Sequence, residues 1–252
     1  MAEPSMSNKQ VPCPEHRPAT GCAAFDVVPQ TALVCLPMRV ADGPWHMAAD
    51  ETLLRLATYG QAYFRLYRWH PATVTLGYFQ RVQDLHAHPQ WGGYPYVRRP
   101  TGGGAILHAD DVTYALALPP QVARSRQAAD WHCFIHRVLA DWLAAQGVPA
   151  TVCSTSEKPH HFDCFGVPRS GDVVSGTNKI IGSAQRLYCG ALLQHGSMHL
   201  PLASSALQAL PGVLARALAL PLAEQDWRPE MEAAIHDLAE SKYSRPAWNE
   251  RR

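Results

Sequence analysis

The stretch RRPTGGGAILHADDVTYALALP, residues 98–119, decides how the rest of the chain is interpreted. Three consecutive glycines remove three side chains and permit positive φ, so backbone N–H groups can converge on an anion or a carbonyl oxygen. Arg98 and Arg99 precede the glycines and add positive charge. The pattern is neither G-x-G-x-x-G nor a Walker loop, because no Lys-Ser or Lys-Thr pair follows. From these residues alone, a tight turn between strands is as good an interpretation as a binding loop.

Short strands and amphipathic helices surround this loop. Apolar residues recur at helical spacing over residues 126–148, and Pro44 suits the start of a second helix over residues 42–60. Aromatic and β-branched runs separated by Gly and Pro turns predict strands; they cover residues 31–40, 62–70, 72–80, 95–100, 105–119 and 170–200, and helix returns after residue 204. Because strands and helices interleave without strict alternation, we expect an α+β fold in which a mixed or antiparallel sheet is packed with helices.

Composition sets bounds on the organisation and the partners of the chain. The 252 residues are 47% hydrophobic and 17% charged, which is typical of a globular protein with one substantial core. The formal net charge of +1 provides no global field for nucleic acid or an anionic membrane. We therefore expect a single domain over residues 31–240, a disordered tail over residues 1–30 and a second tail over residues 241–252. The N-terminus has no apolar segment typical of a secretory signal, and we expect a cytoplasmic protein.

Cys164 is the candidate nucleophile among seven cysteines. Their odd number and irregular spacing do not look like a disulfide framework. Cys164 lies in a polar Gly- and Pro-rich loop near His160 and His161, and an adjacent imidazole would help to form its thiolate. Two other interpretations stay open: Cys164 is a small buried hydrophobic residue, or it binds a metal ion together with the two histidines, although no fourth ligand is evident.

Lys179 and the pair Gln194 and His195 are further candidates. A lysine near a turn is most often a solvated charge, yet a mobile ammonium group also suits an oxygen that gains negative charge. Gln194 and His195 fit a polar pair at a strand end as well as they fit a binding site.

Five motifs in order along the chain resemble one superfamily, that of lipoate–protein ligases, octanoyltransferases and biotin–protein ligases. They are GPWHMAADETLL (43–54), LYRWHPATVTLGYFQ (66–80), RRPTGGGAILH (98–108), NKIIGSAQR (178–186) and LLQHGSM (192–198). The segments CFGVP (164–168) and LHADDVTY (107–114) are similar to those of the cysteine-dependent octanoyltransferases. The resemblance implies the catalytic-domain fold of the biotin and lipoate ligases.

The resemblance also implies roles for particular residues. The glycine loop wraps an acyl chain and its activated carbonyl in this superfamily, so Cys164 and Lys179 are expected to be catalytic. The residues implied to line the acyl site are Arg99, Gly102, Gly103, Gly104, His108, Gly182, Ser183, Ala184, Gln194 and His195.

The function implied is octanoyl transfer for lipoate biosynthesis. Octanoate would move from acyl carrier protein to Cys164, and then to a lysine of a lipoyl-domain protein such as a 2-oxoacid dehydrogenase E2 subunit or the glycine cleavage H protein. This route needs no metal or cofactor, and either His160 or His161 could be a base. One alternative is an ATP-dependent lipoate ligase that uses Mg²⁺ and does not need Cys164. Another is a non-catalytic acyl-binding protein.

Overall fold

The computed structural model describes residues 31–154 and 162–252. The tail expected over residues 1–30 and the two candidate bases, His160 and His161, lie outside the described residues. No helix in the described part of the chain is long and apolar enough to cross a membrane.

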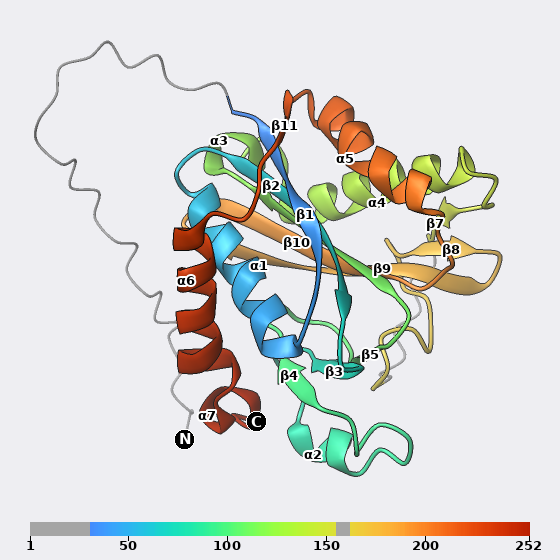
Figure 1. The fold of residues 1–252 in the computed structure, drawn as a ribbon. Helices are drawn as coiled ribbons and strands as arrows, with labels where there is room; N and C mark the ends of the chain where they lie inside the picture. Colours follow the sequence, from blue (N-terminus) through green and yellow to red (C-terminus); the bar gives the residue numbers. More distant parts are fainter. Residues whose placement is uncertain (1–30, 155–161) are drawn as a thin grey trace, which may run out of the picture. The chain divides into compact units, whose positions relative to one another are not determined.

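The core is an eight-stranded sheet with the order β11-β1-β2-β6-β10-β9-β8-β7, accompanied by a three-stranded sheet with the order β4-β3-β5 (Figure 1). Strand β1 runs parallel to both β2 and β11, whereas the remaining neighbours in the large sheet are antiparallel. The sheet is therefore mixed, as expected for the α+β class. The strands are β1 Leu33–Ala41, β2 Ala62–Trp69, β3 Thr73–Leu76, β4 Tyr96–Arg98, β5 Ile106–His108, β6 Val112–Leu118, β7 Thr151–Val152, β8 Val173–Ser175, β9 Asn178–Tyr188, β10 Ala191–Met198 and β11 Leu222–Glu224.

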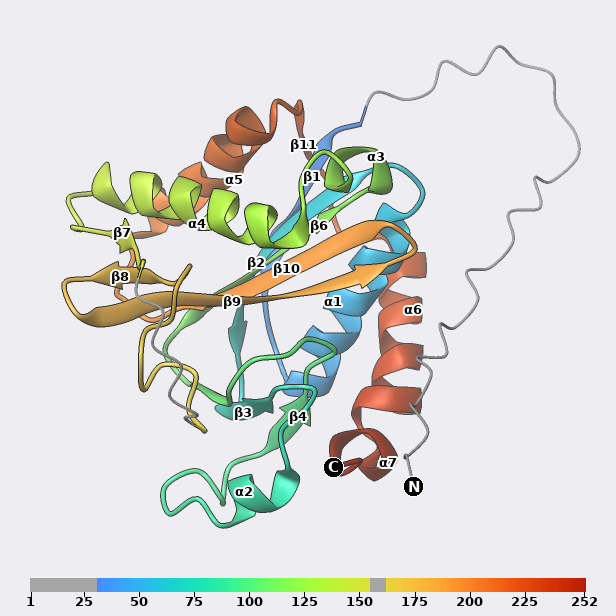
Figure 2. The same ribbon diagram turned by 180° about the vertical axis from the view of Figure 1, so that it is seen from behind.

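Helices cover both faces of the large sheet. Helices α4 and α5 lie on one face and α1 and α6 on the other, as the two opposite views show (Figures 1 and 2). Side chains alternate between the faces along each strand: Phe64 of β2 joins the core beneath α4 and α5, and its neighbour Tyr63 joins the core beneath α1 and α6. The helical elements are α1 Gly43–Ala57, α2 Val82–His86, α3 Pro120–Ala123, α4 Ala128–Ala144, α5 Ser204–Leu218, α6 Pro229–Leu238, the π-helical turn η1 Ala239–Tyr243 and α7 Pro246–Asn249.

Local signals set the ends of the two long helices that the sequence predicted. Asp42 caps α1 by accepting a hydrogen bond from the backbone N–H of Trp45 at 2.9 Å. Gly60 and Gly147 follow α1 and α4 with positive φ values of 107° and 81°, a conformation that favours glycine. The predicted helices over residues 42–60 and 126–148 are thus present, each shortened by its turn residues.

The C-terminal residues differ from the expected tail over residues 241–252. Tyr243 is fully buried, and Asn249 accepts a hydrogen bond from the backbone N–H of Arg98 at 2.9 Å. Trp248 donates its indole N–H to the carbonyl of Arg98 at 2.9 Å. These side chains cover β4, so this segment is part of the folded domain. Apolar residues are few and widely spaced in residues 241–252, so this segment has no periodicity from which its packing on the domain could have been predicted.

Residues 170–200 also differ in detail from the three short strands expected there. Strand β9 has 11 residues and β10 has 8, and they pair over their whole common length. Cys35, Cys133, Cys153 and Cys164 are not bonded in a disulfide.

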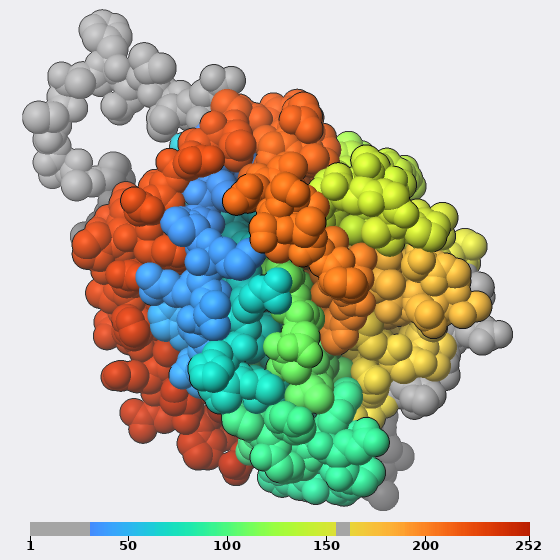
Figure 3. Space-filling model, turned by 45° about the vertical axis from the view of Figure 1, so that its right-hand side comes forward, coloured from blue at the N-terminus to red at the C-terminus, as the bar shows by residue number. Residues whose placement is uncertain are grey.

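A groove of about 820 Å³ lies between β1, β2 and α5, visible as the hollow between the blue and orange segments in Figure 3. Leu36, Phe64 and Leu66 form its apolar floor, and Glu224 and Asp226 lie at its edge. It shares no lining residue with the cavity at Cys164 described below.

Two fully buried histidines in this core are neutral. His46 donates to the carbonyl of Arg68 and accepts from the guanidinium of Arg65, at 2.9 and 3.2 Å. His136 donates to the carbonyl of Gly171 and accepts from the Ser183 hydroxyl, the latter at 2.6 Å. Burial lowers the pKa of each imidazole to about 3, and the charge of Arg65 acts in the same direction on His46.

We expect these histidines to make the fold sensitive to mild acid. Their folded-state pKa values lie below the value of about 6.5 for the unfolded chain, so stability is lost as the pH falls below 6.5 and only the unfolded state takes up protons. Each histidine should remove about 2 kcal/mol from the free energy of unfolding between pH 7 and pH 5. Urea unfolding at the two pH values measures this loss. His136→Gln should reduce the loss by about 2 kcal/mol, and equal stability at both pH values would contradict the assignment.

Candidate active site

Cys164 and Lys179 are in direct contact, although 15 residues separate them in the sequence. The Lys179 ammonium group donates to the Cys164 sulfur at 3.3 Å and to the Cys164 carbonyl at 2.9 Å. It also forms an ion pair with Asp172 at 2.9 Å. Cys164 is half-buried and Lys179 is buried. A cation held at this distance stabilises a thiolate and any negative oxygen formed beside it.

Two glycines are required for this contact because the chain segments approach closely. A methyl group on Gly182 would lie 2.4 Å from Lys179 Cε and 2.7 Å from Nζ. A methyl group on Gly104 would lie 2.9 Å from the backbone nitrogen of Cys164. The glycine loop therefore lies directly against the Cys164 segment, and the backbone N–H of Cys164 donates to the carbonyl of Ala105 at 2.8 Å.

Arg99 binds backbone carbonyl groups of the glycine loop. Its guanidinium donates to the carbonyls of Thr75, Gly102 and Gly104 at 3.0, 3.1 and 2.7 Å. Burial lowers the pKa of Arg99 to about 10, and a thiolate at Cys164 opposes that shift. Within the described residues Arg99 has no carboxylate partner, so its charge is available to an anion at the site.

The orientation of the loop leaves backbone donors free. Because the C=O and the following N–H of a trans peptide point in opposite directions, the N–H of Gly103 points away from Arg99, which binds the carbonyl of Gly102. In the described part of the chain, the N–H groups of Gly102, Gly103 and Gly104 donate to no acceptor. These groups can donate to a substrate oxygen.

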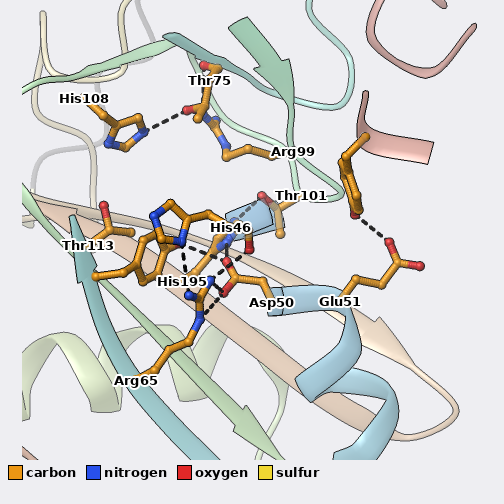
Figure 4. Close-up of polar contacts among 12 residues, drawn as sticks. His46, Asp50, Glu51, Arg65, Thr75, Arg99, Thr101, His108, Thr113 and His195 are labelled. Atoms are coloured by element: carbon orange, nitrogen blue, oxygen red, sulfur yellow. Dashed lines mark hydrogen bonds and ion pairs between the residues drawn. The ribbon is translucent and has the colours of Figure 1, made fainter. Parts of the chain in front are cut away.

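Two carboxylate–imidazole–hydroxyl chains fix the surroundings of the loop; Figure 4 shows the first of them and the contact between His108 and Thr75 of the second. In the first, Asp50 accepts from Nδ1 of His195 at 2.6 Å, and Nε2 of His195 lies 2.7 Å from the hydroxyl of Thr101, the residue before the glycines. Asp50 also binds Arg65, with the closest approach at 2.5 Å, and both side chains are fully buried. The first chain therefore connects α1, β2 and β10 to the loop.

The second chain lies on the other side of the loop. Asp111 accepts from Nδ1 of His108 at 2.8 Å, and Nε2 of His108 lies 3.0 Å from the hydroxyl of Thr75, which also binds Arg99. The hydroxyl groups of Thr113 and Ser197 donate to the same oxygen of Asp111. Burial lowers the pKa of His108, while the partner bonds hold the pKa of Asp111 at about 2. His108 is therefore held in one tautomer, with its ring stacked on Trp69 at 4.1 Å between ring centroids.

A cavity of about 30 Å³ lies between these elements, room for about two water molecules. An eight-carbon chain needs far more space, so side chains at the cavity must move before such a chain enters. The lining residues are Met47, Tyr67, Trp69, Arg99, Gly103, Ile106, His108, Thr113, Cys164, Gly182, Ser183, Ala184, His195, Gly196 and Ser197.

The structure brings together most of the residues singled out from the sequence, and Gln194 is the one that lies farthest from this arrangement in orientation. Gln194 lies on the opposite face of the sheet from the cavity, where its amide donates to the Tyr114 hydroxyl at 2.9 Å. Neighbouring residues on a strand point to opposite faces, so Gln194 and His195 do not share a site. Ser183 lines the cavity, but its hydroxyl bonds Tyr114 and His136 towards α4. Of the three loop glycines, only Gly103 lines the cavity itself.

The sequence interpretation missed the acidic residues that organise the site. Asp50, Asp111 and Asp172 are all buried and bonded to candidate site residues. Asp50 carried a detectable signal, because it lies on the apolar face of α1 between Met47 and Leu54, where a charge needs a partner. Within the described residues there is no cluster of three or more His, Cys, Asp or Glu side chains that could hold a metal ion.

Comparison with known families agrees with this geometry. Residues 42–217 match the family model of the lipoyl protein ligase A/B catalytic domain. The chain belongs to this family. The match contains α1, the glycine loop, Cys164 and Lys179, and it confirms the resemblance noted in the motifs.

Relatives in this ligase A/B family include proteins named octanoyltransferase LipM. The one from Symbiobacterium thermophilum is 34% identical over 168 residues, 62% of this chain and 61% of the relative. The one from Moorella thermoacetica is 35% identical over 176 residues, 65% of this chain and 63% of the relative. The chain thus matches about three fifths of the length of these relatives.

Solved structures of lipoate protein ligases share the fold. A putative lipoate protein ligase from T. acidophilum with bound lipoic acid superposes with a TM-score of 0.73 at 21% identity, covering 88% of this chain and all of that one. A lipoate-protein ligase A bound with ATP gives a TM-score of 0.71 at 21% identity, covering 88% of this chain and 99% of that chain. The predicted ligase-like catalytic fold is therefore confirmed.

Proposed function

We propose that the chain is an octanoyltransferase that carries the acyl group on Cys164. The observation that carries this proposal is the 3.3 Å contact between the Cys164 sulfur and the Lys179 ammonium group, at the edge of a loop with free backbone donors. A ligase that activates a carboxylate with ATP has no need of a nucleophilic sulfur at this place. The names of the LipM relatives support the same assignment.

In the first step the Cys164 thiolate attacks the carbonyl carbon of an octanoyl thioester. The new C–S bond forms as the carbonyl oxygen becomes an oxyanion, which Lys179 and the N–H of Gly103 stabilise. Collapse breaks the bond to the donor sulfur, which leaves as a thiol after taking up the proton that Cys164 released. The acyl group then remains on Cys164 as a thioester.

In the second step a neutral lysine amine of the acceptor attacks this thioester. The C–N bond forms, the bond to Cys164 breaks, and the proton lost by the amine returns the cysteine to its thiol form. Exchange between two thioesters is close to balanced and conversion to an amide is downhill, so no nucleotide is required. The donor proposed is octanoyl-acyl carrier protein. The acceptors proposed are lipoyl-domain proteins, namely 2-oxoacid dehydrogenase E2 subunits or the glycine cleavage H protein.

Arg99, His108 and His195 support the reaction without taking part in bond making. Arg99 binds the loop carbonyls, and the two histidine chains hold the hydroxyl groups of Thr101 and Thr75 beside them, so that the free N–H groups keep their direction when the substrate binds. Because the loop is already ordered in the folded protein, no free energy has to be spent on ordering it when the substrate reacts.

One experiment separates this proposal from its alternatives. The protein is incubated with octanoyl-acyl carrier protein without nucleotide, its intact mass is measured, and the modified residue is located by peptide mapping. An octanoyl adduct on Cys164 that disappears when a lipoyl domain is added is the expected result. Turnover only with ATP and free acid would identify a ligase, and no turnover in either condition would identify an acyl-binding protein.

A further inference from the structure

An exposed group of arginines lies beside the glycine loop. On one face of β9, Gly182 and Ala184 line the cavity, and Arg186 follows at the same alternate-residue spacing. Arg186 is exposed and donates to the carbonyl of Pro100 at 3.2 Å, two residues before the glycines. Arg186 therefore lies where the catalytic face of β9 reaches the surface.

Two more arginines extend this group through aromatic side chains. Arg186 and Arg251 both lie over the ring of Tyr78, at 5.7 and 4.4 Å from its centroid. Arg252 lies 5.3 Å from the ring of Phe79, which is 68% exposed. The backbone N–H of Tyr78 donates to the carbonyl of Thr101 at 2.8 Å, so this end also adjoins the glycine loop. We call Arg186, Arg251 and Arg252 the arginine rim.

The positive charge of the arginine rim is not neutralised within the described part of the protein. None of its three arginines forms an ion pair there. Glu51 binds Arg55 and Lys242, and Glu250 accepts from the neutral Tyr96 hydroxyl at 3.2 Å without forming an ion pair with the rim. The whole chain has a net charge of only +1, so this excess is a local feature.

The reach of each substrate indicates which partner meets the rim. An acceptor lysine extends only about 6 Å from its backbone, so the surface of the acceptor domain must lie on the entrance itself when its amine reaches Cys164. An acyl donor that carries its thioester on a long flexible arm can bind farther away. Because the rim adjoins the glycine loop at Pro100 and Thr101, an acceptor domain whose lysine reaches Cys164 past this loop lies against the rim.

We infer that the arginine rim is the docking surface for a lipoyl domain with acidic residues around its target lysine; this rests on the proposed function. The guanidinium groups pair with those carboxylates, and the exposed ring of Phe79 adds apolar contact area.

Charge reversal tests the inference. The variant Arg251→Glu/Arg252→Glu leaves the contact between Arg186 and Pro100 intact, and Arg137→Glu on α4, at the opposite face of the sheet, is a control for charge reversal away from the rim. With acyl-enzyme prepared from octanoyl-pantetheine, we expect kcat/KM for a lipoyl domain to fall about tenfold or more in the double variant. Transfer to a free lysine amide and formation of the acyl-enzyme should be unchanged, and the control should match the unmodified protein in all three assays.

The other outcomes overturn the inference in distinguishable ways. An equal loss with the lysine amide would show that the arginines act on the site rather than on docking. A loss confined to acyl-enzyme formation from acyl carrier protein would assign the rim to the donor. Absence of any acyl-enzyme in the unmodified protein would instead contradict the proposed function. Raising the salt concentration should slow transfer to the lipoyl domain in the unmodified protein and have little effect in the double variant.

Discussion

Cys164→Ala is expected to abolish octanoyl transfer, with a decrease in kcat on the order of 10⁴-fold or more, because no other group in the site can form the thioester. The side chain is half-buried and its sulfur contacts the lysine ammonium, so alanine removes the nucleophile and leaves the loop contacts of the backbone in place. The measurement is transfer to a lipoyl domain, together with the intact mass after incubation with the donor.

Matched variants make this result specific. Cys133→Ala removes an exposed thiol on α4, at the opposite face of the sheet, and should keep full activity. Cys164→Ser keeps the shape of the side chain but replaces the thiolate with a weak nucleophile, and should slow the first step more than it disturbs folding. Retention of transfer in Cys164→Ala would remove the basis of the mechanism.

Lys179→Met is expected to lower kcat by about 10²- to 10³-fold, the usual cost of removing one donor to a developing oxyanion. Methionine has a similar length but no charge, so it no longer stabilises the thiolate at 3.3 Å or the oxyanion beside it. The rate at which iodoacetamide alkylates Cys164 at neutral pH should fall in parallel, which separates activation of the sulfur from later steps.

A second variant keeps this prediction testable if Lys179→Met folds poorly. Removing the ammonium group leaves the buried carboxylate of Asp172 without its partner. Gly182→Ala retains both residues and instead places a methyl group 2.4 Å from Lys179 Cε, which must displace the ammonium group from the sulfur. A reduced alkylation rate in a protein that retains its fold is the expected result. An unchanged rate would show that the ammonium group does not activate the cysteine.

The parts of the site that lie close together in the sequence could be predicted from it. The glycine triplet and its flanking strands could be predicted because the glycines, the two arginines before them and His108 lie within one short stretch. Strand and helix positions followed from periodicity, which each segment carries independently. The contact between Cys164 and Lys179 was inferred only through a resemblance to known motifs, since spacing alone leaves a cysteine in a loop without a partner.

The remaining parts depend on which face a strand presents and on distant partners. Gln194 and His195 are adjacent in the sequence, yet only His195 reaches the cavity, and the assignment requires the register of β10 against β6 and β9. Asp50 lies 145 residues from His195, so the pair cannot be recognised from either segment alone. The packing of Trp248 on β4 likewise depends on a contact between residues 150 positions apart.

Asp50 also has a consequence for how this protein can diverge over evolutionary time. One carboxylate serves Arg65 in the core and His195 beside the catalytic loop. A change at position 50 thus affects both the buried ion pair of the core and the position of the Thr101 side chain. Substitutions of Asp50 in α1 should therefore be selected against because they lower activity. Residues 50, 65, 101 and 195 should vary together among related proteins.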